Sequence, residues 1–462
     1  MAGENGWKPL GSVAKVRSGY AFKSSDMGDV GEPVIKIKNI NPPRVDTSDC
    51  QRVPREIIER VSNYERYELA EGDILIAMTG ATVGKVGRLP ASREIHYLNQ
   101  RVGKVYLADE AAADYDYIYY VLSQDTYVRQ MFGVADGSAQ ANISGSQIEK
   151  LQVPLPPLSE QKAIAEILGS LDAKIELNRR MNETLESLAR ALFKSWFVDF
   201  DPVRAKLDSG TGVPPVKGPL QNQGRDAPAT PPGLPPATAA LFPDSFDSST
   251  GIPSGWHSTP LSDLTADNSP ITYGVVKPGP HDENGVRFVR GGDVACGRIA
   301  VEDLRTITQE VSDQYKRTLL RGGEILVSLV GNPGEVAVVP PCLCGANIAR
   351  QVGLIRLRDE ISTSFVKCFL ASAAGRDALN AHSLGSVQQV INLRDLKTVK
   401  VPLPTADLLK RFDQVAAPLQ QRADENELQT RTLATLRDAL LPRLLSGELR
   451  VADAARTAAE VC

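Results

Sequence analysis

The chain has 462 residues, of which 42% are hydrophobic and 23% charged; this is typical of a soluble globular protein, and the length is too great for one compact core. It has no run of about 18 apolar residues, and its polar N-terminus lacks the apolar core of a signal peptide, so we expect a cytoplasmic protein without a membrane span. A formal net charge of −4 argues against a protein that coats nucleic acid by bulk positive charge. That charge still allows a protein that reads base edges with a few placed cations.

The first predicted elements are strands. Residues 34–38 alternate apolar and basic side chains, which predicts a half-buried strand with Lys36 and Lys38 on its open face. Residues 72–76 predict a second strand, which runs into a glycine loop at 79–84. The same order recurs about 248–251 residues later, with an alternating segment at 286–290, an apolar segment at 323–327 and a glycine loop at 330–334.

The repeat continues to the end of each half. Arg101-Val102-Gly103 matches Gln351-Val352-Gly353, and Gly137-Ser138-Ala139-Gln140 matches Gly385-Ser386-Val387-Gln388. Next, Ser144 with Gln147 and Asn392 with Asp395 have the spacing of a helix N-cap and its N3 partner. Both predicted short helices lead into a Val-Pro-Leu-Pro segment, at 153–156 and 401–404. Matches at this many ordered points predict a tandem duplication.

A long helix is predicted after each Val-Pro-Leu-Pro segment. Its apolar residues keep alternating spacings of four and three over about four to five heptads in the first half, with Asn178 and Asn182 at the centre. The predicted seam consists of Ile164, Leu168, Leu171, Ile175, Asn178, Asn182, Leu185 and Leu192 in the first helix and of Phe412, Leu419, Leu433 and Leu440 in the second. We predict that the two seams pack against each other and that the buried asparagines fix their register. The alternative is that each helix packs only on its own domain.

The fold class that follows is α+β: two tandem α/β domains joined by two long antiparallel coiled-coil helices with pseudo-twofold symmetry. A segment rich in Pro, Gly, Ser and Ala lies between the halves and is typical of a linker. The predicted parts are a first domain at 1–157, a long helix at 158–206, a linker at 207–255, a second domain at 256–405, a second long helix at 406–450 and a tail at 451–462.

Two motifs suggest catalysis but are better explained as turns. The loop from Gly80 to Gly84 with Lys85 is one residue short of a phosphate-binding loop and is followed by Val86, which offers no hydroxyl for magnesium. Asn41-Pro42-Pro43 resembles the catalytic loop of amino-methyltransferases, yet Arg44 replaces the aromatic residue that stacks on a flipped base. We therefore predict a glycine turn and a chance match.

Histidine and cysteine give no catalytic or metal site either. The four histidines (His96, His257, His281 and His382) have no nucleophile–base spacing. Cys342 and Cys344 lack the second pair of ligands that a zinc site needs, so we expect free thiols. No catalytic residue, bound metal or bound cofactor is predicted for this chain.

Polar, basic and aromatic residues at corresponding places in both halves are the candidates for recognition of double-stranded DNA. Cations suit phosphates and guanine edges, amides suit adenine edges, and rings can stack; ordinary loop packing, solvated strand charges and local capping are the alternatives. The candidates are Tyr20, Phe22, Lys23, Lys36, Lys38, Thr79, Lys85, Arg101, Ser138, Gln140 and Asn142 in the first half, and Tyr273, Lys277, Arg287, Arg290, Asn332, Arg350, Gln351, Ser386, Gln388 and Gln389 in the second.

The ends of the predicted long helices resemble a known family. Leu158-Ser159-Glu160-Gln161-Lys162-Ala163-Ile164-Ala165, the segment from Leu192 to Val203 and the segment from Leu440 to Leu449 are similar to the helices of type I restriction–modification specificity subunits. The resemblance covers nearly the whole chain and is weakest inside the two domains. The second helix departs from it by opening with Leu408-Leu409-Lys410-Arg411-Phe412.

The resemblance implies two target-recognition domains, each reading one half of a split, asymmetric DNA site, with the helices as a spacer that sets the unread gap. It also implies partners: two methyltransferase subunits that bind S-adenosylmethionine, and restriction subunits driven by ATP with Mg²⁺. These cofactors are expected on the partner subunits. Two other hypotheses are a coiled-coil adaptor whose heads bind protein or carbohydrate, and a duplicated enzyme that binds a nucleotide at its glycine loops.

Overall fold

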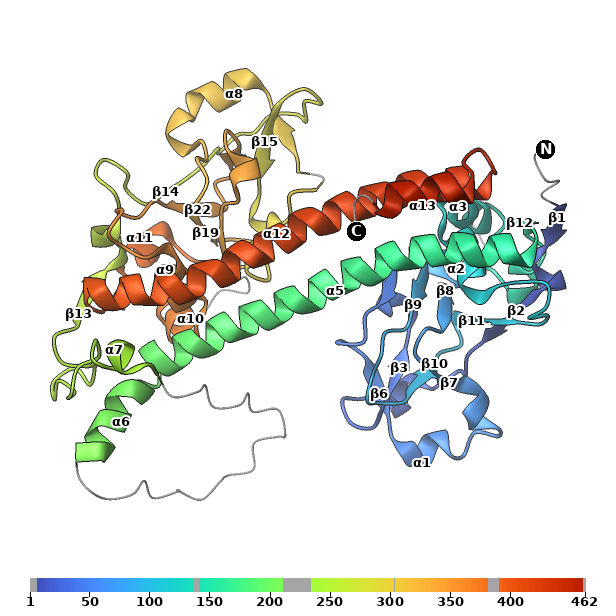
Figure 1. Cartoon of the computed structure of the whole chain (residues 1–462), viewed down its shortest axis with the longest axis horizontal. Helices are drawn as coiled ribbons and strands as arrows, with labels where there is room; N and C mark the ends of the chain where they lie inside the picture. The colour runs from blue at the N-terminus through green and yellow to red at the C-terminus, as the bar shows by residue number, and fades with distance from the viewer. Residues whose placement is uncertain (1–5, 136–140, 211–233, 303, 381–389, 460–462) are drawn as a thin grey trace. The chain divides into compact units, whose positions relative to one another are not determined.

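The computed structural model describes residues 6–135, 141–210, 234–302, 304–380 and 390–459. The chain forms two compact units, and the boundaries between them lie within the two long helices. Unit 1 consists of Met1–Arg179 and Leu428–Cys462, and unit 2 of Arg180–Glu427. Helices α5 (Leu158–Phe197, green in Figure 1) and α12 (Ala406–Leu445, red) each contribute one half to either unit. We call residues 6–155 head 1 and residues 257–403 head 2.

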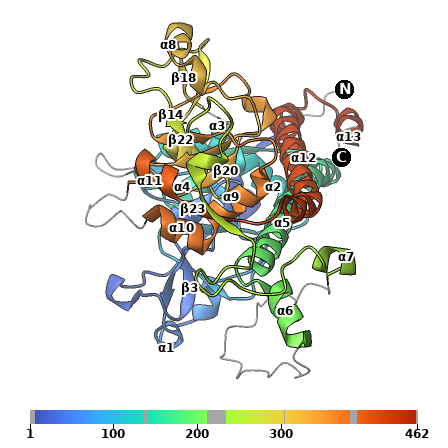
Figure 2. The same ribbon diagram turned by 90° about the vertical axis from the view of Figure 1, so that its left-hand side faces the viewer.

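Head 1 is built from three small sheets. Its N-terminal strand β1 (Gly6–Pro9) pairs antiparallel with its C-terminal strand β12 (Gln152–Leu155), which closes the domain. A six-stranded sheet has the order β2 (Ala14–Ser18), β11 (Val102–Leu107), β8 (Ile74–Ala77), β9 (Val86–Arg88), β5 (Arg44–Val45), β4 (Ile40–Asn41). A four-stranded sheet has the order β6 (Gln51–Val53), β3 (Glu32–Ile35), β10 (His96–Leu98), β7 (Glu68–Leu69). Figure 2 shows α1 (Arg55–Ile58) and β3 at the end of head 1 that is remote from α5.

Three further helices cover head 1: α2 (Tyr115–Ser123), α3 (Asp125–Gly133) and α4 (Gly145–Ile148). Asp114 caps α2 by accepting the backbone N–H of Tyr117, and the predicted capping box of Ser144 and Gln147 is present at α4. Residues 117–122 of α2 are all buried, in one core with the long helices. Helix α2 therefore joins the sheets of head 1 to α5 and α12.

Head 2 repeats this arrangement. Strand β13 (His257–Pro260) pairs with β23 (Lys400–Leu403), as β1 pairs with β12. The other sheets have the orders β14 (Thr272–Tyr273), β22 (Val352–Ile355), β19 (Ile325–Ser328), β20 (Val336–Val338); β18 (Thr306–Ile307), β15 (Val286–Val289), β21 (Asn347–Ile348); and β16 (Val294–Ala295), β17 (Arg298–Ile299). The helices are α8 (Gln309–Gln314), α9 (Thr363–Ala371), α10 (Ala373–Asn380) and α11 (Leu393–Thr398).

The predicted tandem duplication is confirmed strand by strand. Strand β3 pairs parallel with β10 in head 1, and β15 pairs parallel with β21 in head 2. The offset is 248 residues between the starts of α5 and α12, 251 between β1 and β13, and 254 between β3 and β15, because the loops between these elements differ in length. The mixed α/β fold with two long helices is likewise confirmed.

The prediction of a strand over 34–38 is wrong beyond Ile35. Strand β3 ends there, Lys36 occupies the N-cap position of a 3₁₀ turn over Ile37–Asn39, and the side-chain oxygen of the buried Asn39 accepts the backbone N–H of Lys36. In head 2, β15 ends at Val289 and Arg290 caps the equivalent turn. A side-chain cap at the strand end outweighs the alternating pattern.

In unit 1 the two predicted seams share one core. Ile164, Leu168 and Leu171 of α5 are at most 1% exposed and lie in the same cluster as Leu433 and Leu440 of α12. Ile175 packs against this cluster while partly exposed. Polar contacts show the direction of the pairing: Asp172 meets Arg437 at 2.7 Å, and Asn178 donates to Gln429 at 3.0 Å. Numbers rise on one helix as they fall on the other, so the helices run antiparallel.

Unit 2 contains the same antiparallel pairing. Asn426 donates to Asn182 at 2.9 Å, and Asn182 donates to the carbonyl oxygen of Ala423 at 3.2 Å, with both asparagines at most 2% exposed. The seam continues through the aromatic pair Trp196 and Phe412, whose ring centroids are 6.0 Å apart. Leu185, Leu192 and Leu419 are half-buried.

The seam of α12 has members that the sequence analysis missed. Between Ala423 and Leu440 the spacing of three and four is completed by Asn426, Thr430 and Arg437. These residues are polar, so a search for apolar residues passes over them, although the asparagines of α5 signalled a polar centre. The structure also corrects the alternative that each helix packs only on its own domain, since both helices contribute to the core of each unit.

The segment predicted as one helix and a linker is more structured than expected. Helix α5 ends at Phe197, Phe200 takes a left-handed conformation, and α6 (Asp201–Gly210) follows. The described part of the predicted linker includes α7 (Pro236–Ala239) and the buried Phe242, which packs on Trp196. The predicted tail forms α13 (Val451–Ala459). Aromatic side chains in a Pro-rich segment bury enough apolar surface to order that part of it.

A first prediction concerns the buried asparagine pair. Asn182→Ala removes two hydrogen bonds from the buried seam, the one accepted from the Asn426 amide and the one donated to the carbonyl oxygen of Ala423, and should lower the free energy of unfolding by about 1–3 kcal/mol. The double variant N182L/N426L removes both polar groups and should be as stable as the wild-type chain or more stable. The measurement is the urea midpoint of the loss of helical circular dichroism. Leu188→Ala, at a side chain 53% exposed on the same helix, is the control, and an equal midpoint for Asn182→Ala and the control would contradict the prediction.

Candidate nucleic-acid interface

Four loops of head 1 meet at one edge of its sheets. They comprise residues 19–23, 78–85, 99–101 and 141–144, and we call them loop edge 1. Backbone hydrogen bonds join them: Gln100 N–H to Tyr20 O at 2.9 Å, Met78 N–H to Arg101 O at 3.0 Å, Gly80 N–H to Ala141 O at 2.8 Å, and Ile143 N–H to Met78 O at 2.9 Å. Segments far apart in sequence thus form one continuous surface.

Head 2 forms the same surface from residues 273–277, 328–335, 349–351 and 390–392, which we call loop edge 2. Its bonds follow the same scheme: Arg350 N–H to Val275 O at 2.9 Å, Leu329 N–H to Gln351 O at 2.8 Å, and Ile391 N–H to Leu329 O at 3.0 Å. The duplicated backbone therefore presents equivalent loops in both heads.

Most of the predicted recognition residues within the described ranges gather on these two edges. Loop edge 1 exposes the side chains of Lys23, Lys85, Arg101 and Asn142. Loop edge 2 exposes those of Tyr273, Lys277, Asn332 and Arg350, with Gln351 half-buried beside them. Such a mixture of cations, amides and a ring can bind phosphates and base edges.

Three predicted residues of head 1 pack inward. Phe22 is 7% exposed and its ring lies edge-on to Tyr20, with centroids 5.0 Å apart, and Tyr20 also contacts Tyr67 at 5.8 Å. Thr79 is 2% exposed, and its hydroxyl donates to the carbonyl oxygen of Ala141 at 3.3 Å and contacts Asn142. Loop packing, the alternative left open by the sequence, accounts for Phe22 and Thr79.

The four cations that were predicted on the open faces of strands have different environments in the structure. Lys36 and Arg290 occupy equivalent positions as caps of the 3₁₀ turns, beside loops 99–101 and 349–351. Burial, and then the charge of Lys38, lower the pKa of Lys36. Lys38 pairs instead with Asp49 at 2.7 Å, and the Arg287 guanidinium donates to the carbonyl oxygen of Cys342. The four cations therefore do not share one strand face, because the chain turns at residue 36.

The register of the strands also corrects the pairing of the aromatic candidates. Tyr273 lies opposite Gly353, as Ser18 lies opposite Gly103, so Tyr273 is equivalent to Ser18 and not to Tyr20. Ser138, Gln140, Ser386, Gln388 and Gln389 lie outside the described residues.

Two polar residues escaped the sequence analysis, Gln100 in loop edge 1 and Arg44 in strand β5. Gln100 is exposed and equivalent to Arg350, one position before the matched pair Arg101 and Gln351. The aligned Val-Gly motif that follows gave the signal, since it fixes the register of the preceding loop. Arg44 was considered only as a substitute for an aromatic residue, yet it forms an ion pair with Glu176 of α5 at 2.6 Å.

The glycine loops are turns, as predicted. The segment 80–84 connects the antiparallel strands β8 and β9, with Gly80 and Gly84 in left-handed conformations. A phosphate-binding loop instead leads from a strand into a helix, whose N-terminus holds the phosphate. Similarly, Asn41-Pro42-Pro43 forms the turn between β4 and β5.

Histidine and cysteine do not form a reactive cluster in the described part of the chain. His96 is buried, and burial lowers its pKa. Cys342 and Cys344 are free and exposed. Among the residues that the structure describes, no three His, Cys, Asp or Glu side chains are grouped so as to hold a metal ion. Nor does any helix of the described ranges have the length and hydropathy of a membrane span.

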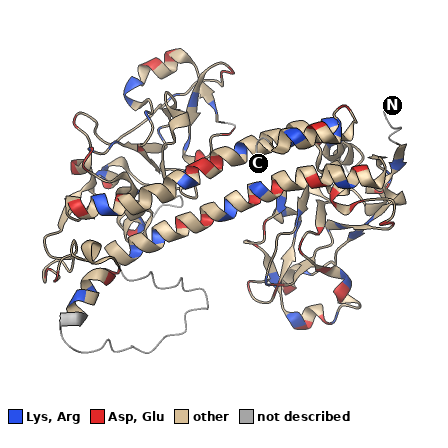
Figure 3. Cartoon of the chain, viewed as in Figure 1, with Lys and Arg blue, Asp and Glu red and all other residues tan. Residues whose placement is uncertain are grey.

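Charges of both signs are interspersed over the heads and the helices, as Figure 3 shows, and acidic residues gather near the middle of α12 at Asp424, Glu425 and Glu427. This distribution agrees with the formal net charge of −4. The exposed cations of the loop edges, Lys23, Lys85, Arg101, Lys277 and Arg350, therefore belong to a surface of mixed charge.

Comparison with known proteins gives a consistent result. Residues 4–187 match the family described as type I restriction modification DNA specificity domain. The chain is 26% identical to the type I restriction enzyme EcoBI specificity subunit of Escherichia coli, over 95% of this chain and 85% of that protein. It is 24% identical to the type I restriction enzyme MjaIX specificity subunit of Methanocaldococcus jannaschii, over 73% of this chain and 70% of that protein.

A solved structure shares the fold. The crystal structure of the type I restriction-modification system S subunit from M. genitalium aligns with a TM-score of 0.54 at 16% identity, over 96% of this chain and 97% of that one. At this identity the likeness concerns the arrangement of the backbone alone.

A second prediction tests how the loop edges are assembled. A Cβ on Gly274 would lie 1.8 Å from the carbonyl oxygen of Ile348, so Gly274→Ala must push loop 273–277 away from its neighbour. We expect a loss of about 1–3 kcal/mol in the free energy of unfolding. Gly292→Ala is the matched control, since nothing lies within 4 Å of its added Cβ. Equal thermal midpoints for the two variants would show that the close approach is not required.

Proposed function

This chain belongs to the family of type I restriction–modification specificity subunits, and we propose that it selects the DNA sequence on which an enzyme of that kind acts. One observation supports the proposal above the others. Both heads build the same four-loop edge from equivalent backbone, and each places a different set of polar side chains on it. A constant scaffold with variable loops is the arrangement expected of two readers with different targets.

The differences between the edges suggest an asymmetric target of two parts. Arg101 in head 1 corresponds to Gln351 in head 2, and Lys85 corresponds to Glu335. Arginine favours guanine edges or phosphates, whereas glutamine favours adenine edges and glutamate accepts from cytosine. We propose that loop edge 1 and loop edge 2 each contact one half-site, through the exposed residues named above.

The long helices are proposed to set the unread gap between the half-sites. Each has 40 residues, about 60 Å at about 1.5 Å per residue. Their antiparallel register is fixed by polar pairs, Asn178 with Gln429 and Asn182 with Asn426. A buried asparagine in such a seam typically selects one register. A helix pair of fixed register holds a fixed length, which is the property required of a spacer.

We further propose that the chain has no catalytic activity of its own. Two methyltransferase subunits and the restriction subunits are the proposed partners, and S-adenosylmethionine, ATP and Mg²⁺ are assigned to those subunits. The glycine turns between antiparallel strands support this assignment, because they lack the helix that a nucleotide-binding loop needs.

A third prediction concerns phosphate contacts of Arg101 in loop edge 1 and of Lys36 beside it. Arg101→Ala and Lys36→Ala should each weaken DNA binding by the assembled enzyme and reduce the slope of log affinity against log salt by about 0.9 for each phosphate that the variant no longer neutralises. Lys38→Ala is the control, because its ammonium is paired with Asp49 within the protein. The measurement is equilibrium binding to target duplex at several salt concentrations. An unchanged slope in both test variants would remove these cations from the interface.

A fourth prediction concerns the spacer. Insertion of one heptad into each long helix, after Arg179 and before Leu428, preserves the seam and adds about 10 Å to the pair. We expect the enzyme to modify sites with a changed gap while both half-sites keep their sequence. Mapping of methylated bases in cells that contain the variant and its partner subunits provides the measurement. Altered half-site sequences, or an unaltered gap, would be inconsistent with helices that act as a spacer.

A further inference from the structure

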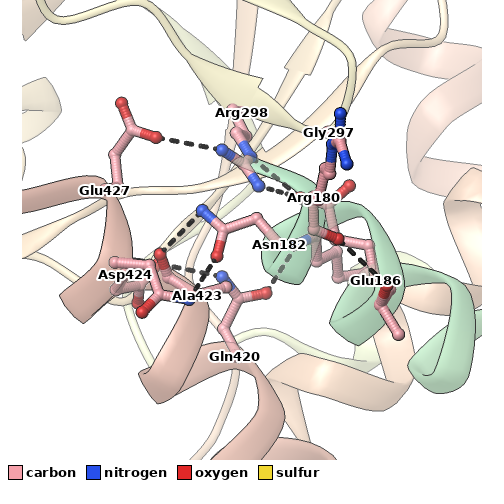
Figure 4. A network of polar contacts seen from close by, with 12 residues as sticks. Arg180, Asn182, Glu186, Gly297, Arg298, Gln420, Ala423, Asp424 and Glu427 are labelled. Carbon is pink, nitrogen blue, oxygen red and sulfur yellow. Dashed lines mark hydrogen bonds and ion pairs between the residues drawn. The ribbon is translucent and has the colours of Figure 1, made fainter. Parts of the chain in front are cut away.

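In unit 2 one arginine joins head 2 to both long helices. Arg298 is the first residue of β17, at the turn of the β16–β17 hairpin. Its Nε donates to Glu186 Oε1 of α5 at 2.8 Å, and a terminal nitrogen donates to Glu427 Oε2 of α12 at 3.1 Å, as Figure 4 shows. Three segments that are more than 100 residues apart in sequence therefore meet at one guanidinium.

Unit 1 has a corresponding junction made of different residues. Asp172 of α5 accepts a hydrogen bond from the Tyr120 hydroxyl of α2 at 2.6 Å and one from Arg437 of α12 at 2.7 Å. Burial, and then the charge of Asp172, raise the pKa of Tyr120, so the phenol stays protonated and keeps donating. Here too one side chain connects the head with both helices.

The two junctions are not copies of each other. By the offset of 248 residues, Tyr120 and Asp172 correspond to Cys368 and Gln420, which lack the same chemistry. Arg44 is the equivalent of Arg298 and pairs with Glu176 of α5. An arginine of the hairpin thus pairs with α5 in both halves, whereas the contact that also includes α12 is made by Arg298 in unit 2 and by Asp172 in unit 1. The halves of a duplicated chain keep the connection of a head to both helices although the residues that complete it differ, which indicates that the connection itself is what the fold requires.

The junction of unit 2 is also tied to loop edge 2. Gly297 of the hairpin donates its backbone N–H to Glu335 at 3.3 Å, and Asn332 donates to the carbonyl oxygen of Val294 at 3.4 Å. Asn332 and Glu335 belong to segment 328–335 of loop edge 2. A short chain of hydrogen bonds therefore runs from the long helices through the hairpin to the surface proposed to contact DNA.

We propose that Arg298 and Asp172 are positioning residues that fix the direction in which each loop edge faces relative to the helices, and thereby restrict the gap between half-sites. This inference rests on the proposed function. Successive base pairs are about 3.4 Å apart along the duplex, so a small rotation of a head moves its loop edge by one base-pair step. Charge-assisted hydrogen bonds to two helices resist such a rotation better than apolar packing, which has no preferred direction.

The test uses the assembled enzyme and a panel of duplexes. Each duplex carries the two half-sites, taken from the mapped methylated sites, at the natural gap or with one or two base pairs added or removed. The wild-type enzyme should bind the natural gap best. For Arg298→Ala and for Asp172→Asn, which keeps the shape of the side chain, we expect that preference to fall about threefold to tenfold, with the base preferences of both half-sites unchanged.

Two matched variants separate positioning from a general effect on folding. Arg422→Ala removes an exposed arginine of α12 whose partner, Glu425, is on the same helix, and it should keep the wild-type gap preference. Arg298→Lys keeps a cation that can reach one glutamate at a time, and it should recover part of the preference. Both comparisons are made on protein with a wild-type circular dichroism spectrum.

The outcomes distinguish positioning of the loop edges by Arg298 and Asp172 from a general contribution to the stability of the fold. Weaker binding by the same factor at every gap would mean that Arg298 and Asp172 only stabilise the fold, and the inference would be overturned. An unchanged gap preference in both variants would overturn it as well. If the wild-type enzyme bound all gaps equally, the proposed reading of a split site would fail together with the inference.

Discussion

The burial of one helix seam against the other is the constraint on which the rest of the structure depends. Neither α5 nor α12 can remove its apolar stripe from water alone, and helices of this composition gain most of their stability from packing. In unit 1, Leu168 of α5 and Leu433 of α12 are fully buried in one core with α2 of head 1. Each head is therefore completed by a helix from the other half of the chain, and each loop edge takes its position within its unit from the two helices.

Within that frame, the backbone of each head is fixed and its loop side chains are free to vary. The pairing of β3 with β10 and of β15 with β21 recurs in both heads, and so do the backbone bonds between the four loops. Close approaches such as that of Gly19 to the carbonyl oxygen of Leu98 leave no room for a side chain. The exposed positions, among them Arg101 and its counterpart Gln351, carry no such restriction. Two copies of one scaffold can in this way hold two different sets of contacts.

Polar groups inside the helix pair fix the register of α5 against α12 and restrict the orientation of the side chains that they join. The asparagine pair Asn182 and Asn426 is buried where an apolar pair would pack with less loss of hydration. The junctions at Arg298 and Asp172 likewise bring charge into partly buried positions. Apolar contacts tolerate sliding and rotation, whereas hydrogen bonds have preferred angles. In a protein proposed to measure distance along DNA, a fixed register and orientation offset the loss of hydration of these buried polar groups.

The sequence by itself determined the duplication, the two long helices, the polar centre of the first seam and the glycine turns, because local spacing and capping carry that information. Only the tertiary structure decided that Phe22 and Thr79 pack inward, that Lys38 is paired with Asp49, and that Arg44 and Arg298 contact the helices. It also showed Asn426, Thr430 and Arg437 in the seam of α12. The partners of Arg44 and Arg298 are more than 100 residues away in sequence, and even the nearer partner of Lys38 is reached only because the chain turns at residue 36. Periodicity along one segment cannot identify such partners.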